Sequence, residues 1–453
     1  MDQSPSQPPL PPEPMATSPQ SAPPRRDDRL RRICFRFGFS YFGPYILVTQ
    51  MLGILLPLPV GELPELGALP PLRNLVMSVA RRVFGVRSPL VFAASGSGDK
   101  IFDWVQVFCL LSLALAATAI WTWVDRRRDR ALDPYADVRK WFRLFVRFAV
   151  GSTMITYGMV KAIPLQMPAP QLTRLLEPYG NFSPMGVLWY SVGAAHAYES
   201  FAGCAELLGG TLLFLPRTAT LGALVCLAES IQIFMLNITY DVPVKLFSFH
   251  LILLSLFLLS PEMPRLVSVL LLNRTAGPST QPPLFTSRRA NRIAVALQAV
   301  FGAYLIGMNL YADARAYYQR GGGAAKSPLY GIWNVTQMSI DGQVRAPLIT
   351  DYDRFRRVIF QSPTTASFQR MDDTFVPYTA AIDVGARSII LTKTGAANQK
   401  STWSFQRPTA EQLSLDGDMD GHRIHMQLQR YDHSKFLLLS RGFHWIQEYP
   451  FNR

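Results

Sequence analysis

Long apolar segments separated by short polar stretches occupy residues 31–315, a pattern typical of proteins with several membrane-spanning helices. A helix needs roughly 20 residues to cross a bilayer, and each segment is close to that length or longer. We therefore predict a polytopic α-helical membrane bundle of about seven spans. The predicted spans are 33–58, 101–124, 141–163, 191–215, 218–239, 243–260 and 293–311.

From about residue 326 onward, apolar and polar residues alternate in short runs that Asp-Gly pairs separate. Such runs predict an antiparallel β-barrel over 326–453, and its Gly331-x-Trp333 opening resembles the first strand of lipocalin-like barrels. The aromatic tail after residue 440 is predicted to close the barrel as a strand or to dock it on the membrane. The predicted strands are 331–339, 355–360, 365–370, 374–383, 388–393, 401–406, 411–416, 422–430 and 436–440.

Two further segments complete the predicted organisation of the chain. Residues 1–30 are rich in Pro, Ser and Gln and end in arginines, which predicts a disordered cytoplasmic tail. Residues 72–86 are amphipathic and fit either a helix on the membrane surface or a helix that covers the bundle. Both alternatives stay open at this point.

Composition agrees with a membrane domain joined to polar segments. The chain is 49% hydrophobic but only 17% charged, where a soluble domain carries about 25% charged residues. The net charge is +14, and the basic residues cluster at 25–36, 126–143 and 265–292, on one side of a seven-span bundle. The positive-inside rule makes that side cytoplasmic and the C-terminal domain extracytoplasmic. Nucleic-acid binding is disfavoured, because the basic clusters do not interleave with aromatics.

The sequence contains no recognisable metal, haem or nucleotide motif. Its cysteines lie in apolar segments without a CxxC pair, and its C-terminal histidines match no zinc spacing. The cysteines are Cys34, Cys109, Cys204 and Cys226, and the histidines are His422, His425, His433 and His444.

Ionisable residues inside the predicted spans are the strongest functional signal. Such residues are costly in a bilayer and by default mark a site. At 1.5 Å per residue, Glu206 lies about 10 Å deeper than Glu199, and Glu229 is equally near the middle of its span. The others fall in the outer half of the bundle, and Asn237 is grouped with them. They are Asp99, Lys161, His196, Glu199, Asp241, Lys245 and His250.

Structural explanations compete with a site for the outer group. Long side chains near a span end can extend to the headgroups, and Asp241 and Lys245 have the i, i+4 spacing of a helix ion pair. Glu206 and Glu229 lie too deep for that, so they must be paired, protonated or exposed to a cavity.

Short motifs within 141–260 resemble the DoxX family of bacterial membrane proteins. The motifs are Arg147-Phe-x-x-Gly151, Tyr157-Gly158-x-x-Lys161, Tyr198-Glu199, Glu206-Leu-x-Gly209-Gly210 and Arg217-Thr-Ala. The resemblance implies a four-helix core associated with quinone-linked or thiol-linked oxidoreductases in the bacterial inner (cytoplasmic) membrane. The missing cysteine pair argues against the thiol-linked branch.

A fainter similarity connects the chain with the vitamin K-dependent carboxylase and related HTTM membrane proteins. It rests on the Gly-x-x-Lys span, on Phe182-Ser183-Pro184 and on Met235-Leu236-Asn237. This likeness places Lys161 near the lysine that acts as a base on a hydroquinone.

We therefore expect Lys161, Glu199 and Glu206 to be catalytic, and Asp99, His196, Glu229, Asn237, Asp241, Lys245 and His250 to surround a quinone. The leading hypothesis is a quinone-binding oxidoreductase subunit, and a partner protein would supply the electrons. One alternative is a membrane anchor or transporter-like scaffold that displays a ligand-binding barrel. Another is a carboxylase-like modifying enzyme.

Overall fold

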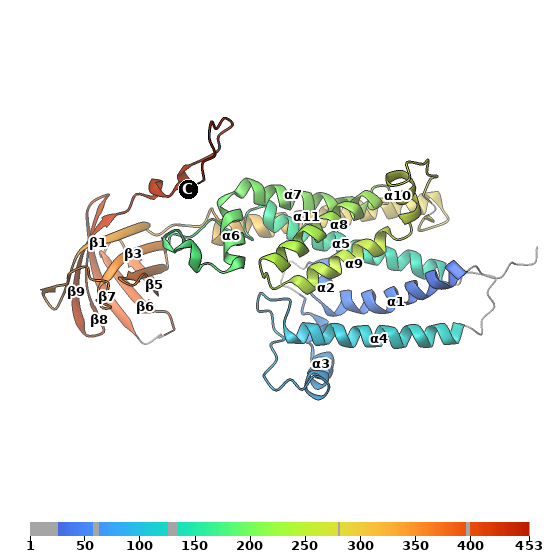
Figure 1. The fold of residues 1–453 in the computed structure, drawn as a ribbon, viewed down its shortest axis with the longest axis horizontal. Coiled ribbons are helices and arrows are strands. Elements are labelled where there is room, and N and C mark those ends of the chain that lie inside the picture. The colour runs from blue at the N-terminus through green and yellow to red at the C-terminus, as the bar shows by residue number, and fades with distance from the viewer. Residues whose placement is uncertain (1–25, 58–62, 126–134, 280, 396–398, 453) are drawn as a thin grey trace, which may run out of the picture.

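The computed structural model describes residues 26–57, 63–125, 135–279, 281–395 and 399–452. It contains a bundle of long helices with a β-barrel at one end (Figure 1). Most of the tail predicted at 1–30 lies outside the described residues, and the first helix begins at Arg26 rather than after residue 30.

Each predicted span contains at least one helix of the bundle, and the first, 33–58, is divided into α1 and α2. Shorter helical turns lie at Leu66–Ala68, Arg174–Leu176 and Tyr179–Asn181. The helices are α1 (Arg26–Val48), α2 (Met51–Leu55), α3 (Pro70–Arg82), α4 (Ile101–Asp125), α5 (Ala136–Ala162), α6 (Pro184–Ala194), α7 (His196–Phe214), α8 (Ala219–Thr239), α9 (Lys245–Leu259), α10 (Met263–Leu270) and α11 (Arg288–Arg320).

Among the described residues, three helices are long and apolar enough to cross a membrane, namely α4, α8 and α11. A fourth span is counted if α9 and α10 act together, although they are bent by 87°. The predicted count of seven is thus not supported. The physical reason is that α1, α5 and α7 carry more polar and charged residues, and α5 and α7 keep several of these, such as Lys161 and Glu206, inside the bundle.

Glycines allow α5 and α7 to pack backbone against backbone. Gly151 and Gly158 on α5 face Gly210 and Gly203 on α7, and a Cβ on either Gly158 or Gly203 would lie under 3.0 Å from backbone atoms of the other helix. Small residues permit this close approach between membrane helices. The contact brings the last turn of α5 against the middle of α7.

The amphipathic segment 72–86 forms most of α3, which packs on the start of α4. Val76 and Ala80 are buried against Phe102 and Val105. This contact matches the alternative of a helix that covers the bundle. Leu75 stays 56% exposed, so part of the apolar face of α3 has no protein neighbour.

The C-terminal domain is an antiparallel barrel of eight main strands, with β2 as a short extra ribbon. Neighbouring strands pair in sequence order, and β1 pairs with β9 to close the barrel, with Val335 opposite Leu428. The strands are β1 (Gly331–Ile340), β2 (Gln343–Val344), β3 (Phe355–Ser362), β4 (Thr365–Arg370), β5 (Phe375–Asp383), β6 (Ser388–Lys393), β7 (Lys400–Thr409), β8 (Gln412–Met419) and β9 (His422–Arg430).

Eight of the predicted strands are confirmed, but the ninth, at 436–440, is wrong. That segment forms the short helix α12 (Leu437–Ser440), and 441–452 contains no strand. The prediction fails because β9 already pairs with β1, which leaves no open edge for a closing strand. The tail residues are largely exposed, with Trp445 at 90%.

Large side chains fill the interior of the barrel. Trp333, Phe368 and Trp403 are at most 1% exposed, and the indole nitrogen of Trp333 donates to the carbonyl of Leu329 over 2.9 Å. Gly417 lies opposite Trp403 in the register, and a Cβ there would collide with the indole ring. The interior is therefore a packed core.

The segment between α5 and α6 packs against the barrel and holds it on the bundle. The amide of Leu172 donates to Oε1 of Gln361 over 2.9 Å, and Leu172 is buried with Ile332 and Ile359 of the barrel. The barrel thus sits at the end of the bundle where α5 ends and α7 begins (Figure 1).

The turn after β1 and the start of β9 carry an exposed pair whose strength depends on pH. His422 Nδ1 lies 2.7 Å from Asp341 Oδ2, and this hydrogen bond raises the pKa of His422 and lowers that of Asp341. The contribution of the histidine is complete below its ordinary pKa of about 6.5 and is lost as pH rises through its higher folded value. The contribution of the aspartate is lost as pH falls through its depressed pKa.

We expect the NMR titration midpoint of His422 to lie above the ordinary histidine value and to move back towards it in Asp341→Asn. The amide oxygen of asparagine still accepts a hydrogen bond but carries no charge. An unchanged midpoint in that variant would mean that Asp341 does not cause the shift.

Candidate functional site

Lys161 and Glu206 form a buried ion pair in the bundle. Lys161 Nζ lies 2.6 Å from Glu206 Oε1, and the two residues are 8% and 1% exposed. The glycine contact between α5 and α7 positions them, since Lys161 follows Gly158 by three residues and Glu206 follows Gly203 by three. The second oxygen of Glu206, Oε2, is buried without a hydrogen-bond partner among the described residues. The pair therefore keeps one oxygen able to accept a proton or a hydrogen bond.

Glu229 belongs to the same cluster. It is half-buried on α8 and interacts electrostatically with both Glu206 and Lys161. The structure thus brings together the two deepest carboxylates and the lysine that the sequence singled out. Two carboxylates and one ammonium leave the cluster one negative charge in excess when all are ionised.

Glu199 is buried one turn into α7 but contacts the chain after α5 rather than Lys161. Its Oε1 accepts from the amide of Met167 over 2.8 Å, and its Oε2 lies 4.0 Å from Nδ1 of His196. Oε2 has no hydrogen-bond partner within the described part of the chain. The main visible role of Glu199 is to hold the segment between α5 and α6, which contacts the barrel.

Asp99 and Lys245 meet at the start of α9. The carboxylate of Asp99 accepts from the amides of Lys245 and Leu246 over 2.9 and 2.8 Å. A carboxylate on the first free amides of a helix is a stabilising cap. Lys245 Nζ lies 2.8 Å from Asp241, whose side chain is 82% exposed.

Asn237 is also engaged at this corner, where its amide donates to Ser248 over 3.0 Å and to the carbonyl of Val244 over 3.3 Å. Together, Asp99, Asn237, Asp241 and Lys245 fix the turn between α8 and α9. These contacts support the explanation that the four residues stabilise the helix ends rather than bind a ligand.

His250 is held in one orientation in the core. Its Nδ1 lies 2.7 Å from the carbonyl of Leu246, and its Nε2 lies 2.7 Å from the hydroxyl of Tyr41. A carbonyl only accepts, so Nδ1 donates and the neutral ring accepts from Tyr41 at Nε2. The ring also stacks on Tyr45, with centroids 4.0 Å apart. His250 therefore supports Tyr45.

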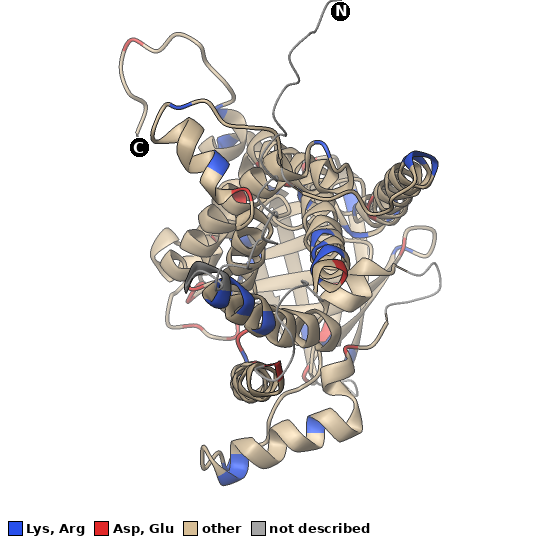
Figure 2. Cartoon of the chain, turned by 90° about the vertical axis from the view of Figure 1, so that its right-hand side faces the viewer, with Lys and Arg blue, Asp and Glu red and all other residues tan. Residues whose placement is uncertain are grey.

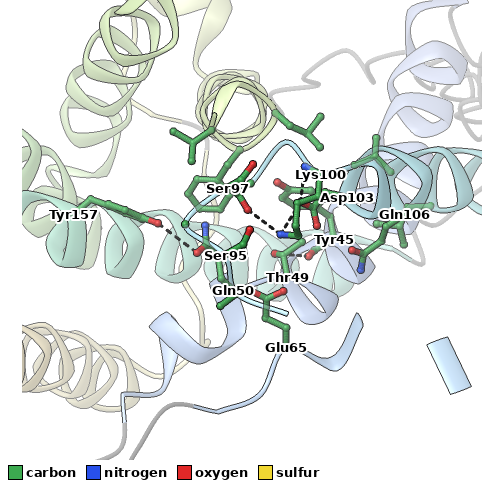
Figure 3. Close-up of a pocket in the computed structure, with 18 residues that line it drawn as sticks. Tyr45, Thr49, Gln50, Glu65, Ser95, Ser97, Lys100, Asp103, Gln106 and Tyr157 are labelled. Carbon is green, nitrogen blue, oxygen red and sulfur yellow. Dashed lines mark hydrogen bonds and ion pairs between the residues drawn. The ribbon is translucent and has the colours of Figure 1, made fainter. Parts of the chain in front are cut away.

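Tyr45 in turn lines a cavity of about 260 Å³ where α1 ends and α4 and α9 begin (Figure 3). The cavity lies between α1, α4, the start of α9 and residues 94–98, and Tyr157 of α5 reaches it. Its apolar wall includes Val107, Leu110 and Phe247. Its polar side chains are Tyr45, Thr49, Gln50, Glu65, Ser95, Ser97, Lys100, Asp103, Gln106 and Tyr157.

Charges and hydrogen bonds organise the polar side of the cavity. Lys100 Nζ lies 2.9 Å from Asp103 and donates to the carbonyl of Ser97 over 2.8 Å. The hydroxyl of Tyr157 donates to Oε1 of Gln50 over 3.3 Å. An ammonium, a carboxylate, amides and phenols thus meet apolar side chains in one concave space, which is the usual make-up of a small-molecule site.

None of the ten predicted site residues lines this cavity. Asp99 and Lys245 only adjoin it, and Lys161 lies one helical turn beyond Tyr157. The sequence analysis searched for charge, whereas Tyr45, Gln50 and Gln106 are uncharged. A usable signal was nevertheless present, because Gln50 and Gln106 are polar residues inside predicted spans, where a position facing lipid would be costly.

Comparisons with known proteins give one relevant relative. No family model matches the chain, and no solved structure matches it significantly. The chain is 32% identical over 118 residues to the uncharacterized protein YwoB of Bacillus subtilis (strain 168). The aligned region is 26% of this chain and 72% of that protein.

Proposed function

The chain belongs to the same family as the uncharacterized protein YwoB of Bacillus subtilis, and we propose that it is a membrane protein that binds the head group of a quinone-type lipid. The observation that carries this proposal is the cavity between α1, α4 and α9, where hydrogen-bonding side chains face apolar ones.

The chemistry of the cavity suits a quinone ring. A quinone presents a flat apolar ring with two carbonyl oxygens, and Lys100, Gln50 and Gln106 carry donors for them. The volume of about 260 Å³ is slightly below the usual range of roughly 300–1,000 Å³ for small-molecule sites. We therefore infer that only the head group enters and that the isoprenoid tail stays in lipid.

Reduction of a quinone to a hydroquinone takes two electrons and two protons. Glu65 and Asp103 line the cavity and are candidates to deliver the protons. The Lys161–Glu206 pair lies one helical turn beyond Tyr157, and we assign it a proton-exchanging role on the strength of its free carboxylate oxygen. A redox partner protein would supply the electrons.

We further propose that the bundle belongs to the DoxX family and that α1, α5 and α7 cross the bilayer beside α4, α8 and α11. Lys and Arg dominate the bundle end opposite the barrel (Figure 2), which supports a cytoplasmic assignment for that end and an extracytoplasmic, lipocalin-like barrel. The filled barrel interior disfavours the alternative in which the barrel is the ligand-binding part.

The proposal predicts that a quinone co-purifies with the protein and depends on the cavity amides. We expect Gln50→Leu combined with Gln106→Leu to lower retention about thirtyfold, since the two lost hydrogen bonds together weaken binding by about 2 kcal/mol. Mass spectrometry of protein purified in native lipids measures the retained quinone.

Gln337→Leu on the barrel surface is the matched control and should retain the quinone. The absence of any quinone from the parent protein would remove the proposal. Equal retention by the cavity variant would show that the quinone binds elsewhere.

A further inference from the structure

Arg143 and Arg147 lie one turn apart on α5, towards the bundle end opposite the barrel. Arg143 donates to Oε1 of Gln281, and Arg147 donates to Oε1 of Gln298 on α11. Both acceptors are neutral amides. Within the described ranges, neither arginine forms an ion pair with a carboxylate.

The carboxylate of Glu262, which acts on Arg143, is already occupied. Glu262 interacts electrostatically with Arg143, but it forms an ion pair with Arg265 and accepts from Ser279 over 2.6 Å. Glu262 is therefore already paired with Arg265, and Arg143 and Arg147 add two positive charges that no ion pair with a carboxylate balances within the described ranges.

The two guanidinium groups also retain unused donors. The Nε atoms of Arg143 and Arg147 are buried and have no hydrogen-bond partner among the described residues. A charge without a counter-charge is costly at membrane depth, and so is a buried donor without an acceptor. A phosphate would relieve both costs, because the planar guanidinium presents several donors to an oxyanion at once.

We propose that Arg143 and Arg147 bind the phosphate of an anionic phospholipid from the leaflet at this end of the bundle. The surroundings identify a lipid as the source of the phosphate. Gln298 is flanked on α11 by Leu297 and Val300, which are 63% and 66% exposed, and α11 is apolar enough to span a membrane. The inference does not depend on the quinone.

Native mass spectrometry of the purified full chain with added dioleoylphosphatidylglycerol tests the proposal, with dioleoylphosphatidylcholine as the zwitterionic reference. The parent protein should retain the anionic lipid preferentially. Arg143→Gln combined with Arg147→Gln should reduce its retention at least tenfold, since hydrogen bonds to charged groups contribute about 1.5–3 kcal/mol each.

Arg288→Gln combined with Arg289→Gln is the matched control, because it removes the same charge from exposed positions at the same end. This control should bind the lipid as the parent does. An equal loss in the control would reduce the effect to general charge attraction and overturn the site. Millimolar inorganic phosphate should not displace the lipid, and full displacement would identify a soluble anion as the ligand instead.

The lysine pair Arg143→Lys and Arg147→Lys separates lipid binding from folding. It keeps both charges but loses the planar fork, so we expect partial retention of the lipid and an unchanged circular dichroism spectrum. Retention below that of the parent by the folded lysine variant would support a site that needs the planar guanidinium groups. Parent-like retention by the glutamine variant would overturn the proposal.

Discussion

Lys161→Met is expected to destabilise the protein by about 3–5 kcal/mol, because it leaves the buried carboxylate of Glu206 without its counter-charge. Glu206→Leu should have an effect of similar size, since it strands the ammonium of Lys161. The loss is large because the residues of the pair are only 8% and 1% exposed, so water cannot replace the missing partner. Unfolding of the detergent-solubilised protein, followed by circular dichroism at neutral pH, measures it.

The double variant Lys161→Met with Glu206→Leu provides the control. It removes both charges and fills the space with apolar side chains, so it should recover most of the lost stability. If it is as unstable as the single variants, the two residues do not act as a pair. If it folds and binds quinone but does not exchange protons with it, the role of the pair is chemical as well as structural.

Gly203→Ala is expected to destabilise the bundle by about 1–3 kcal/mol or more, because its Cβ has no space. The added atom would meet the backbone nitrogen of Ala162 and the carbonyl oxygen of Gly158, and backbone cannot rotate away as a side chain can. The two helices would have to separate, which would also disturb the contact between Lys161 and Glu206. The unfolding measurement used for Lys161→Met reports the loss.

Gly307→Ala is the matched control within a helix. Gly307 lies in α11, where a Cβ would meet no atom within 4 Å. Alanine should therefore leave the stability unchanged or raise it by up to about 1 kcal/mol through its better helix propensity. Equal behaviour of the two alanine variants would show that α5 and α7 do not pack through Gly203.

The barrel was largely predictable because its signal is local. Alternation with a period of two marks each strand, and the Asp-Gly pairs at 341–342 and 420–421 mark turns. The predicted turn at Asp416-Gly417 is wrong, because this pair lies inside β8, where the absence of a side chain on Gly417 makes room for Trp403. The exception at 436–440 arose because Leu437, Leu438 and Leu439 form an apolar run with no barrel edge left to join. Closure is a property of the whole sheet, and no short window of sequence contains it.

The bundle was predictable in its helices but not in its span count. Apolar length locates a helix, but it does not tell whether a polar residue faces lipid or a neighbouring helix. Lys161 and Glu206 lower the apolarity of α5 and α7 while lying inside the bundle. Composition alone does not distinguish a membrane-spanning helix with buried polar residues from a helix that does not cross the membrane.

Depth in the membrane selected Glu206 and Glu229, and both interact with Lys161 in the structure. That these residues form a functional site stays a prediction. The sequence did not indicate the capping role of Asp99, whose partners Lys245 and Leu246 are more than 140 residues away in sequence. It also missed the cavity, since amides and phenols such as Gln50 and Tyr45 do not stand out by charge.

The anchoring of the segment after α5 has a mechanical consequence. Its Met167 is bonded to Glu199 on α7, and five residues later its Leu172 is bonded to Gln361 in the barrel. Because only five residues separate these two contacts, the barrel cannot move far from α7 without breaking one of them. A displacement of the barrel would thus be transmitted to the end of α5 and, through Glu199, to α7 within two turns of Glu206, so the position of the barrel is coupled to the buried ion pair.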